Sequence, residues 1–262
     1  MHTHYVPSSL LSIDTNPKTV KGQRYGFQTG VLYMAPYTLS GANLCPMAHI
    51  ALCHVPCLNS AGNPAYAATK TKGRLNKAHY FLNDPTAFMQ HLARNIARFV
   101  ARAAHDGYTP LVRLNGTTDI RWERVTVRLD EQTARRVGVD PGVYPNIMAL
   151  FPDVQFYDYT KIANRTSIPA NYDLTFSYSG VPAFQPYVAR ARAAGMRIAV
   201  VFQSRHDIPE TFMGMRCVDG DDSDIRHLDP QGVVVALYAK GRARTDTSGF
   251  VVRRVIPIGI AA

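Results

Sequence analysis

The sequence predicts an α/β fold built on a parallel sheet, and three features of the chain indicate it. One long segment repeats its apolar residues at helical spacing, and short apolar runs rich in Val, Ile, Phe and Tyr precede and follow it. Runs of four to six such residues are typical of buried strands. Their alternation with a helix or a long connection favours parallel pairing.

The first expected elements are a strand at Gly30–Met34 and a long helix from Pro85 to about His105. Asp84 is a good N-cap for that helix, and Pro85 occupies its first position, where the missing N–H costs nothing. Gly107 provides the left-handed stop. One apolar stripe is formed at three- and four-residue intervals by Phe88, Leu92, Ile96, Phe99, Val100 and Ala103.

The second half of the chain is expected to contain more strands and one further helix. The helix covers Pro182–Ala194 and ends at Gly195. Each strand is a short apolar run that stops at polar residues or glycine. These strands are expected at Pro110–Leu114, Val154–Tyr159, Asp173–Phe176, Arg197–Phe202, Arg216–Val218 and Val233–Tyr238.

Polar side chains follow most of these runs, at the point where each predicted strand ends. In parallel α/β sheets and barrels, ligands bind at the carboxyl ends of the strands. The sequence therefore predicts a ligand-binding rim of the kind found on a barrel. Its members are Asn115, Thr117 and Asp119, Thr160 and Lys161, Ser177 and Ser179, Gln203 and Ser204, Asp219 to Asp222, and Lys240.

Length and composition fit one α/β domain over residues 1–262, with a core at about 25–254. With 262 residues and 46% hydrophobic content, the chain can bury a full core. No apolar run approaches the ~18 residues of a membrane span, and the N-terminus lacks the pattern of a secretory signal. We therefore expect a cytoplasmic protein without a membrane partner.

The chain is basic, with 29 Lys and Arg against 19 Asp and Glu and a net charge of +10. Such an excess favours anionic partners, so a nucleic acid or a nucleotide is the expected partner class. The basic residues are scattered, and no tail of like charges occurs. A basic protein without a nucleic-acid role remains the alternative.

Three of the four cysteines, Cys45, Cys53 and Cys57, fall within thirteen residues, while Cys217 is distant. Clustered cysteines in a reducing compartment more often bind metal than form disulfides. A four-iron cluster held by three thiolates leaves one iron open to a substrate or cofactor. Cys217, at the end of an apolar run, is expected to be a core residue.

The same segment allows a rival arrangement with zinc. Cys45, His49, Cys53 and Cys57 are spaced four residues apart, so His49 would complete a Cys3His site, and His54 is a second candidate. Pro46 and Pro56 disfavour one regular helix through all of them. Three buried cysteines without metal are the third alternative.

An acidic run, Asp219 to Asp224, offers a separate candidate chemistry. Oxygen-rich clusters suit magnesium or calcium, as in a metal-dependent nuclease. Such runs are more often solvated turns. No Gly-x-Ser-x-Gly motif, phosphate-binding loop or Gly-x-Gly-x-x-Gly motif after a strand is present.

Several sequence blocks resemble a bacteriophage and prophage family described as gene product 88, over about residues 14–254. These blocks are Asn16–Thr19, Leu39–Ala48, Cys57–Asn59, Arg113–Trp122, Phe151–Lys161 and Leu174–Ser177.

A broader likeness is to radical S-adenosylmethionine (SAM) enzymes. A cysteine triplet after a first strand, followed by strands that end in Gly-Thr-Thr-Asp, Tyr-Thr-Lys and Phe-Ser, is similar to their pattern. The likeness implies a partial or distorted TIM-barrel-like parallel sheet and a [4Fe-4S] cluster whose open iron chelates SAM. The gaps of seven and three residues between the cysteines differ from the spacing usual in those enzymes.

The likeness also implies roles for individual residues. Cys45, Cys53 and Cys57 would ligate iron, and Asn115, Thr117 and Asp119 would lie near the SAM amino group. Ribose and carboxylate contacts would come from Thr160, Lys161, Ser177 and Ser179, and Gln203 and Lys240 would face the rim. Asp119, Lys161 and Lys240 are the candidate catalytic residues.

Two functions are therefore expected from the sequence. The first is a phage-type iron–sulfur enzyme of radical-SAM-like architecture that modifies a nucleic acid, a nucleotide or another macromolecule. The second is a non-catalytic nucleic-acid-binding protein stabilised by zinc.

Overall fold

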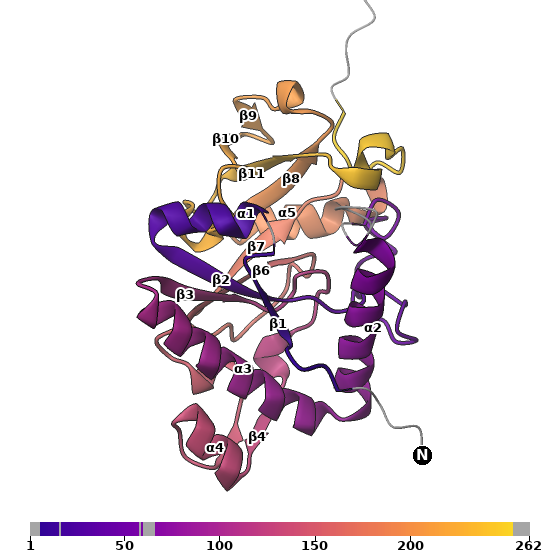
Figure 1. The fold of residues 1–262 in the computed structure, drawn as a ribbon. Helices are drawn as coiled ribbons and strands as arrows, with labels where there is room; N and C mark the ends of the chain where they lie inside the picture. Colours follow the sequence, from indigo (N-terminus) through magenta and orange to yellow (C-terminus); the bar gives the residue numbers. More distant parts are fainter. Residues whose placement is uncertain (1–5, 16, 58, 60–65, 254–262) are drawn as a thin grey trace, which may run out of the picture.

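The computed structural model describes residues 6–15, 17–57, 59 and 66–253. One nine-stranded sheet runs through them in the order β1-β2-β3-β6-β7-β8-β11-β10-β9 (Figure 1). In that order the strands are Leu11–Ile13, Phe27–Leu32, Thr109–Arg113, Gln155–Thr160, Tyr172–Ser177, Ile198–Phe202, Val234–Tyr238, Met215–Asp219 and Thr211–Phe212. A separate two-stranded sheet pairs β4 (Val127–Leu129) with β5 (Gly142–Tyr144).

Neighbouring strands from β2 to β10 pair in parallel, while the edge strands β1 and β9 pair antiparallel. The mixed α/β class and the mostly parallel sheet are thus confirmed. A barrel is not detected, because the sheet in the described part of the chain is open and ends at β1 and β9. Each edge strand has only two or three residues, which leaves little backbone available for barrel closure.

The two predicted helices are present. Helix α3 spans Pro85–His105, and the Asp84 side chain accepts a hydrogen bond from the Ala87 N–H at 2.9 Å, as expected of an N-cap. The second forms as a short 3-10 turn, Pro182–Phe184, followed by α5 (Gln185–Ala193). Gly107 and Gly195 both have positive φ angles, as the predicted stops require.

Three other helices were not predicted: α1 (Pro17–Lys21), α2 (Ala67–Asn83) and α4 (Glu131–Val137). Helix α2 has no acidic residue in its first turn, and its N-cap Tyr66 makes no side-chain cap bond. Its sequence lacks a clear apolar stripe, and accordingly few of its residues are buried. Its helical state is supported instead by packing against α3, where the Phe81 and Phe88 rings lie 5.2 Å apart.

Two apolar clusters form most of the core. One joins α3 to β1, β2 and β3, and Figure 1 shows α3 lying across these strands. The other packs α5 against β7, β8 and β11 and includes Ala51 from the cysteine segment. Helices α3 and α5 thus support the sheet from which the candidate site projects. No helix within the described ranges is long and apolar enough to cross a membrane.

Gly116 follows β3 and continues its pairing with β2 through an N–H bond to the Leu32 carbonyl at 3.0 Å. A Cβ at this position would lie 2.8 Å from that carbonyl oxygen and 2.6 Å from the Tyr33 ring. We expect Gly116→Ala to lower the free energy of unfolding by about 1–3 kcal/mol through overpacking, measured by urea denaturation.

Gly73 in α2 is the matched control, because a Cβ there would meet nothing within 4 Å. We expect Gly73→Ala to stabilise the protein by up to ~1 kcal/mol through helix propensity. Equal effects of the two substitutions would contradict the close approach at Gly116.

Candidate metal centre at the sheet edge

The cysteine segment, residues 36–57, leaves the carboxyl end of β2 and folds back over the neighbouring strand ends. Asp119, beyond β3, donates its backbone N–H to the Leu44 carbonyl at 2.9 Å. The Ser179 hydroxyl, beyond β7, donates to the Ala51 carbonyl at 2.8 Å. Two strand ends therefore hold this segment, one next to Cys45 and one close to Cys53.

Backbone groups also hold the sulfur atoms directly. The Tyr37 N–H donates to Cys45 Sγ at 3.2 Å, and the Asn59 N–H donates to Cys57 Sγ at 3.4 Å. Cys45 Sγ also lies 3.7 Å from the Thr117 carbonyl. Amide bonds to sulfur stabilise a thiolate and tune iron–sulfur sites. The two N–H bonds favour thiolates at Cys45 and Cys57, whereas the Thr117 carbonyl, and the Ala48 carbonyl 3.9 Å from Cys53 Sγ, accept from protonated thiols.

The three thiols lie close enough together to influence one another electrostatically, and none of the four cysteines is in a disulfide. Burial is the largest cause that raises their pKa values, and it contributes most of the rise of the Cys45 pKa to about 12. Negative charge on Cys53 and Cys57 raises the Cys45 pKa further. A metal ion, which requires thiolates, would have to displace these protons.

Two cations face this group of thiols. Burial lowers the pKa of the Lys161 ammonium, while thiolate charge on Cys53 and Cys45 and the Asp119 carboxylate raise it. Arg74 of α2 lowers the pKa of Cys57 and donates to the Asn59 side-chain oxygen at 2.5 Å. The site thus places positive charge next to three groups that carry negative charge only when deprotonated.

Asp119, Thr160 and Lys161 come together, but they bind one another. The Asp119 carboxylate accepts from the Thr160 hydroxyl and from the Lys161 N–H, each at 2.8 Å. The Lys161 ammonium donates to the Ser177 carbonyl, the Ser177 hydroxyl and the Tyr178 carbonyl at 3.0–3.1 Å. All three ammonium donors are thereby used. These residues join the ends of β6 and β7 to the turn after β3.

Asn115 and Thr117 also use their side chains in hydrogen bonds within the protein. The Asn115 side-chain oxygen accepts from Thr118, Ile120 and the Trp122 indole, which shapes the turn after β3. The Thr117 hydroxyl donates to the Met34 carbonyl at 2.6 Å, which ties that turn to the start of the cysteine segment. Asn115 and Thr117 therefore support the turn after β3 and its contact with the cysteine segment, and their role as cofactor ligands stays a prediction.

Gln203 and Lys240 lie farther along the sheet, beyond β8 and β11. Gln203 donates to the Arg244 carbonyl at 2.7 Å, and Lys240 pairs with Asp221 at 2.6 Å. Neither of these contacts involves the cysteine segment. A ligand-binding role of Gln203 and Lys240 stays a prediction.

The acidic run after β10 forms ion pairs. Asp221 contacts Lys18 and Lys240, each at 2.6 Å, and Asp224 pairs with Arg113 at 2.8 Å. Carboxylates neutralised by internal cations make poor ligands for a hard metal ion. This arrangement favours a structural role for the run.

A single zinc ion is not accommodated by the side chains as they stand. Within the described ranges, no three His, Cys, Asp or Glu side chains converge closely enough to hold one ion. His49 is exposed and stacks on His54, with ring centroids 5.8 Å apart. The His54 ring contacts the Ala48 carbonyl at 3.0 Å. His49 and His54 therefore form a ring pair beside the cysteines.

Cys217 lies on β10, paired with Val234 of β11, and packs against the apolar cluster around α5. Burial alone raises its pKa, with no contribution from the other cysteines. Cys217 is thus partly buried at the margin of that cluster, and it is not one of the fully buried core residues.

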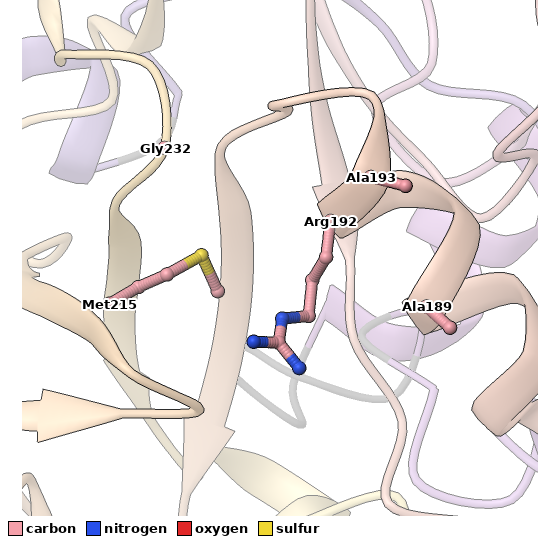
Figure 2. Close-up of a pocket in the computed structure, with 5 residues that line it drawn as sticks. All are labelled: Ala189, Arg192, Ala193, Met215 and Gly232. Carbon is pink, nitrogen blue, oxygen red and sulfur yellow. The ribbon is translucent and has the colours of Figure 1, made fainter.

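A hollow of about 490 Å³ lies elsewhere, between α5 and β10. Figure 2 shows the Arg192 and Met215 side chains extending into the same space, with Ala189, Ala193 and Gly232 around it. None of the predicted site residues lines it, so it is separate from the cysteine group.

Sequence reasoning missed Arg74 and Tyr37. Arg74 lies on α2, which was not predicted, and no sequence pattern indicated that it lies near Cys57. Tyr37 contributes its backbone N–H, and because every residue except proline has this group, the residue type does not indicate the role.

A family model described as gene product 88 matches residues 9–254. Comparisons with curated proteins and with solved structures give no match. The likeness to radical SAM enzymes thus receives no support from these comparisons.

Among the polar residues of this site, we expect substitution of Asp119 to lower the stability of the protein most. Asp119→Ala would leave two buried donors, the Thr160 hydroxyl and the Lys161 N–H, without partners. We expect a loss of about 2 kcal/mol or more in the free energy of unfolding, measured by urea denaturation. Asp153→Ala, at an exposed position, should change it by less than ~0.5 kcal/mol. Similar losses in both variants would refute the scaffold role.

Proposed function

This chain belongs to the gene product 88 family, and from that premise we propose that Cys45, Cys53 and Cys57 hold an iron–sulfur cluster of the [4Fe-4S] type. One observation carries the proposal. Three thiols gather at the carboxyl edge of a parallel sheet, two of them, Cys45 and Cys57, accept N–H···S bonds, and two cations face the group. Ligands of α/β sheets bind at this edge.

Either metal would require the side chains to rearrange, because no three His, Cys, Asp or Glu side chains within the described residues are placed to hold a metal ion. The three thiols influence one another electrostatically, and none is in a disulfide, so all three are available as ligands. Three thiolates on a four-iron cluster leave one iron open, and metal content distinguishes this cluster from zinc.

Charge balance supports the same assignment. A buried ammonium is costly unless negative charge lies nearby, and the Lys161 donors bind only neutral oxygens. The Asp119 carboxylate already compensates it in part, and thiolates at Cys45 and Cys53, or a cluster of net negative charge, would add to that compensation. Arg74 supplies the same compensation at Cys57.

We further propose a radical-SAM-type activity on a nucleic acid or nucleotide. Three protein ligands leave one iron open, and that iron would supply one-electron reduction to a chelated SAM. The succession of β2, β3, β6, β7, β8 and β11 as parallel neighbours supports the partial-barrel architecture that the likeness implies. The net charge of +10 favours an anionic substrate.

Iron content provides the first test. We expect anaerobically purified protein to be brown, to absorb near ~400 nm and to contain about four irons per chain. Cys45→Ser, Cys53→Ser and Cys57→Ser should each lose most of the iron and the colour. Cys217→Ser is the matched control and should keep both, because Cys217 is remote from the other thiols.

Cleavage of SAM provides the second half of this test. With a strong reductant, the loaded protein should release 5′-deoxyadenosine, and the three cysteine variants should release none. A colourless protein with one zinc per chain, or iron loss on Cys217→Ser alone, would contradict the cluster. A loaded cluster without SAM cleavage would retain the cluster and reject the activity.

Lys161 gives a second prediction. Its cation stabilises negative charge on Cys53 and Cys45, so Lys161→Met should make the cluster harder to reduce. The expected shift of the reduction potential is negative and about 40–130 mV for one electron, since a unit charge near a partly buried site contributes ~1–3 kcal/mol. Spectroscopic redox titration measures it. Lys240→Met, which breaks the pair with Asp221, should leave the potential unchanged.

A further inference from the structure

A second basic feature lies away from the cysteine segment, between α3, α4 and the residues before β1. A hollow of about 420 Å³ is lined there by Ser8, His91, Arg94, Arg98 and Arg136. Three of these five residues are arginines, and none is acidic. The hollow shares no residue with the cysteine segment.

Three of the lining residues project from one face of α3. His91, Arg94 and Arg98 are spaced three and four residues apart, and Arg136 comes from the last turn of α4. Like charges at this spacing destabilise a helix. Their effect is visible at His91, where burial first, and then Arg94 and Arg98, lower the pKa. An anion in the hollow would relieve this repulsion.

The walls of the hollow are fixed by buried contacts. The Asn95 side-chain oxygen accepts from the Leu10 N–H at 3.0 Å and from the Ser9 hydroxyl at 3.2 Å, which holds the segment with Ser8 against α3. Arg94 donates to the Thr133 hydroxyl of α4 at 2.9 Å. The segment with Ser8 and the Arg94 side chain are therefore already positioned for a ligand, which lowers the entropic cost of binding them.

Two of the three arginines, Arg98 and Arg136, have no carboxylate partner among the described residues and can therefore pair with an anion. Asp130, the N-cap of α4, accepts from the Thr133 N–H at 2.6 Å, and Arg94 contributes to lowering its pKa. Arg94 is thus partly compensated. In the described part of the chain, no carboxylate lies within ion-pair distance of Arg98 or Arg136. Both side chains are exposed at the rim of the hollow.

We propose that this hollow is a phosphate-binding site, formed by Arg94, Arg98 and Arg136 with the Ser8 hydroxyl. Guanidinium groups bind phosphate oxygens in a bidentate way, and several of them around one space suit an anion with several oxygens. The phosphate belongs either to a nucleic-acid backbone or to a small phosphate compound. The two sources share this chemistry and differ in the probe that binds.

The test compares two double variants that each remove one arginine from α3 and one from α4. Arg98→Ala with Arg136→Ala empties the hollow of its uncompensated charge. Arg102→Ala with Arg135→Ala removes the same charge from exposed positions that do not line it. Circular dichroism and thermal unfolding verify that both variants fold. A labelled single-stranded oligonucleotide is titrated at several salt concentrations, and inorganic phosphate and ATP are titrated by calorimetry.

We expect the hollow variant to weaken binding by about tenfold or more, because charged hydrogen bonds are lost. For the oligonucleotide, the slope of log affinity against log salt should also fall by roughly 1.4, or ~0.7 for each lost phosphate contact. A loss with the oligonucleotide assigns the site to a nucleic acid, and a loss with phosphate or ATP alone assigns it to a small compound. Equal losses in both double variants, or no binding of any probe, would overturn the proposal.

Discussion

The carboxylate of Asp119 is the interaction on which the rest of the site depends. Its two oxygens accept from Thr160, the last residue of β6, and from Lys161, the residue after it, and its backbone N–H binds the carbonyl of Leu44, next to Cys45. Through Lys161, the same group is linked to the end of β7. Burial raises the pKa of this carboxyl, while the hydrogen bonds and the nearby cations lower it. One buried acid thus joins three strand ends to the cysteine segment.

The resulting architecture separates the residues that hold the segment from those that would bind a metal. Hydroxyl and amide side chains at the strand ends form their hydrogen bonds with one another and with the backbone of the cysteine segment and of the residues just before it. The sulfur atoms remain the groups on this edge whose protons a metal could replace. Such rigid support is what a metal site requires, because ligand geometry is set by the groups behind the ligands.

Much of this fold follows from local sequence patterns. The α3 helix was predicted because Asp84, Pro85 and its apolar stripe all indicate the same element. The seven parallel strands were predicted from their short apolar runs, whereas β1, β4, β5 and β9, each of two or three residues, were not. Helix α2 was missed because tertiary packing, through Phe81 and Tyr80 against α3, stabilises a segment without caps. The open sheet could not be predicted, since closure depends on pairing between edge strands of two or three residues.

The residue types in the sequence predicted where the candidate site lies, but they did not predict what each of those residues binds. Polar residues after strands do meet at one edge, yet sequence cannot show whether such a group faces a ligand or a neighbouring carbonyl. The segment with Cys45 and Cys53 depends on anchors far along the chain, at Thr117 and at Ser179, separated by 72 and 128 residues from their partners. During synthesis the cysteines emerge long before these anchors, since the N-terminal part of a chain leaves the ribosome first. A nascent chain would therefore expose unsupported thiols, and the segment reaches its final shape only after most of the sheet has been made.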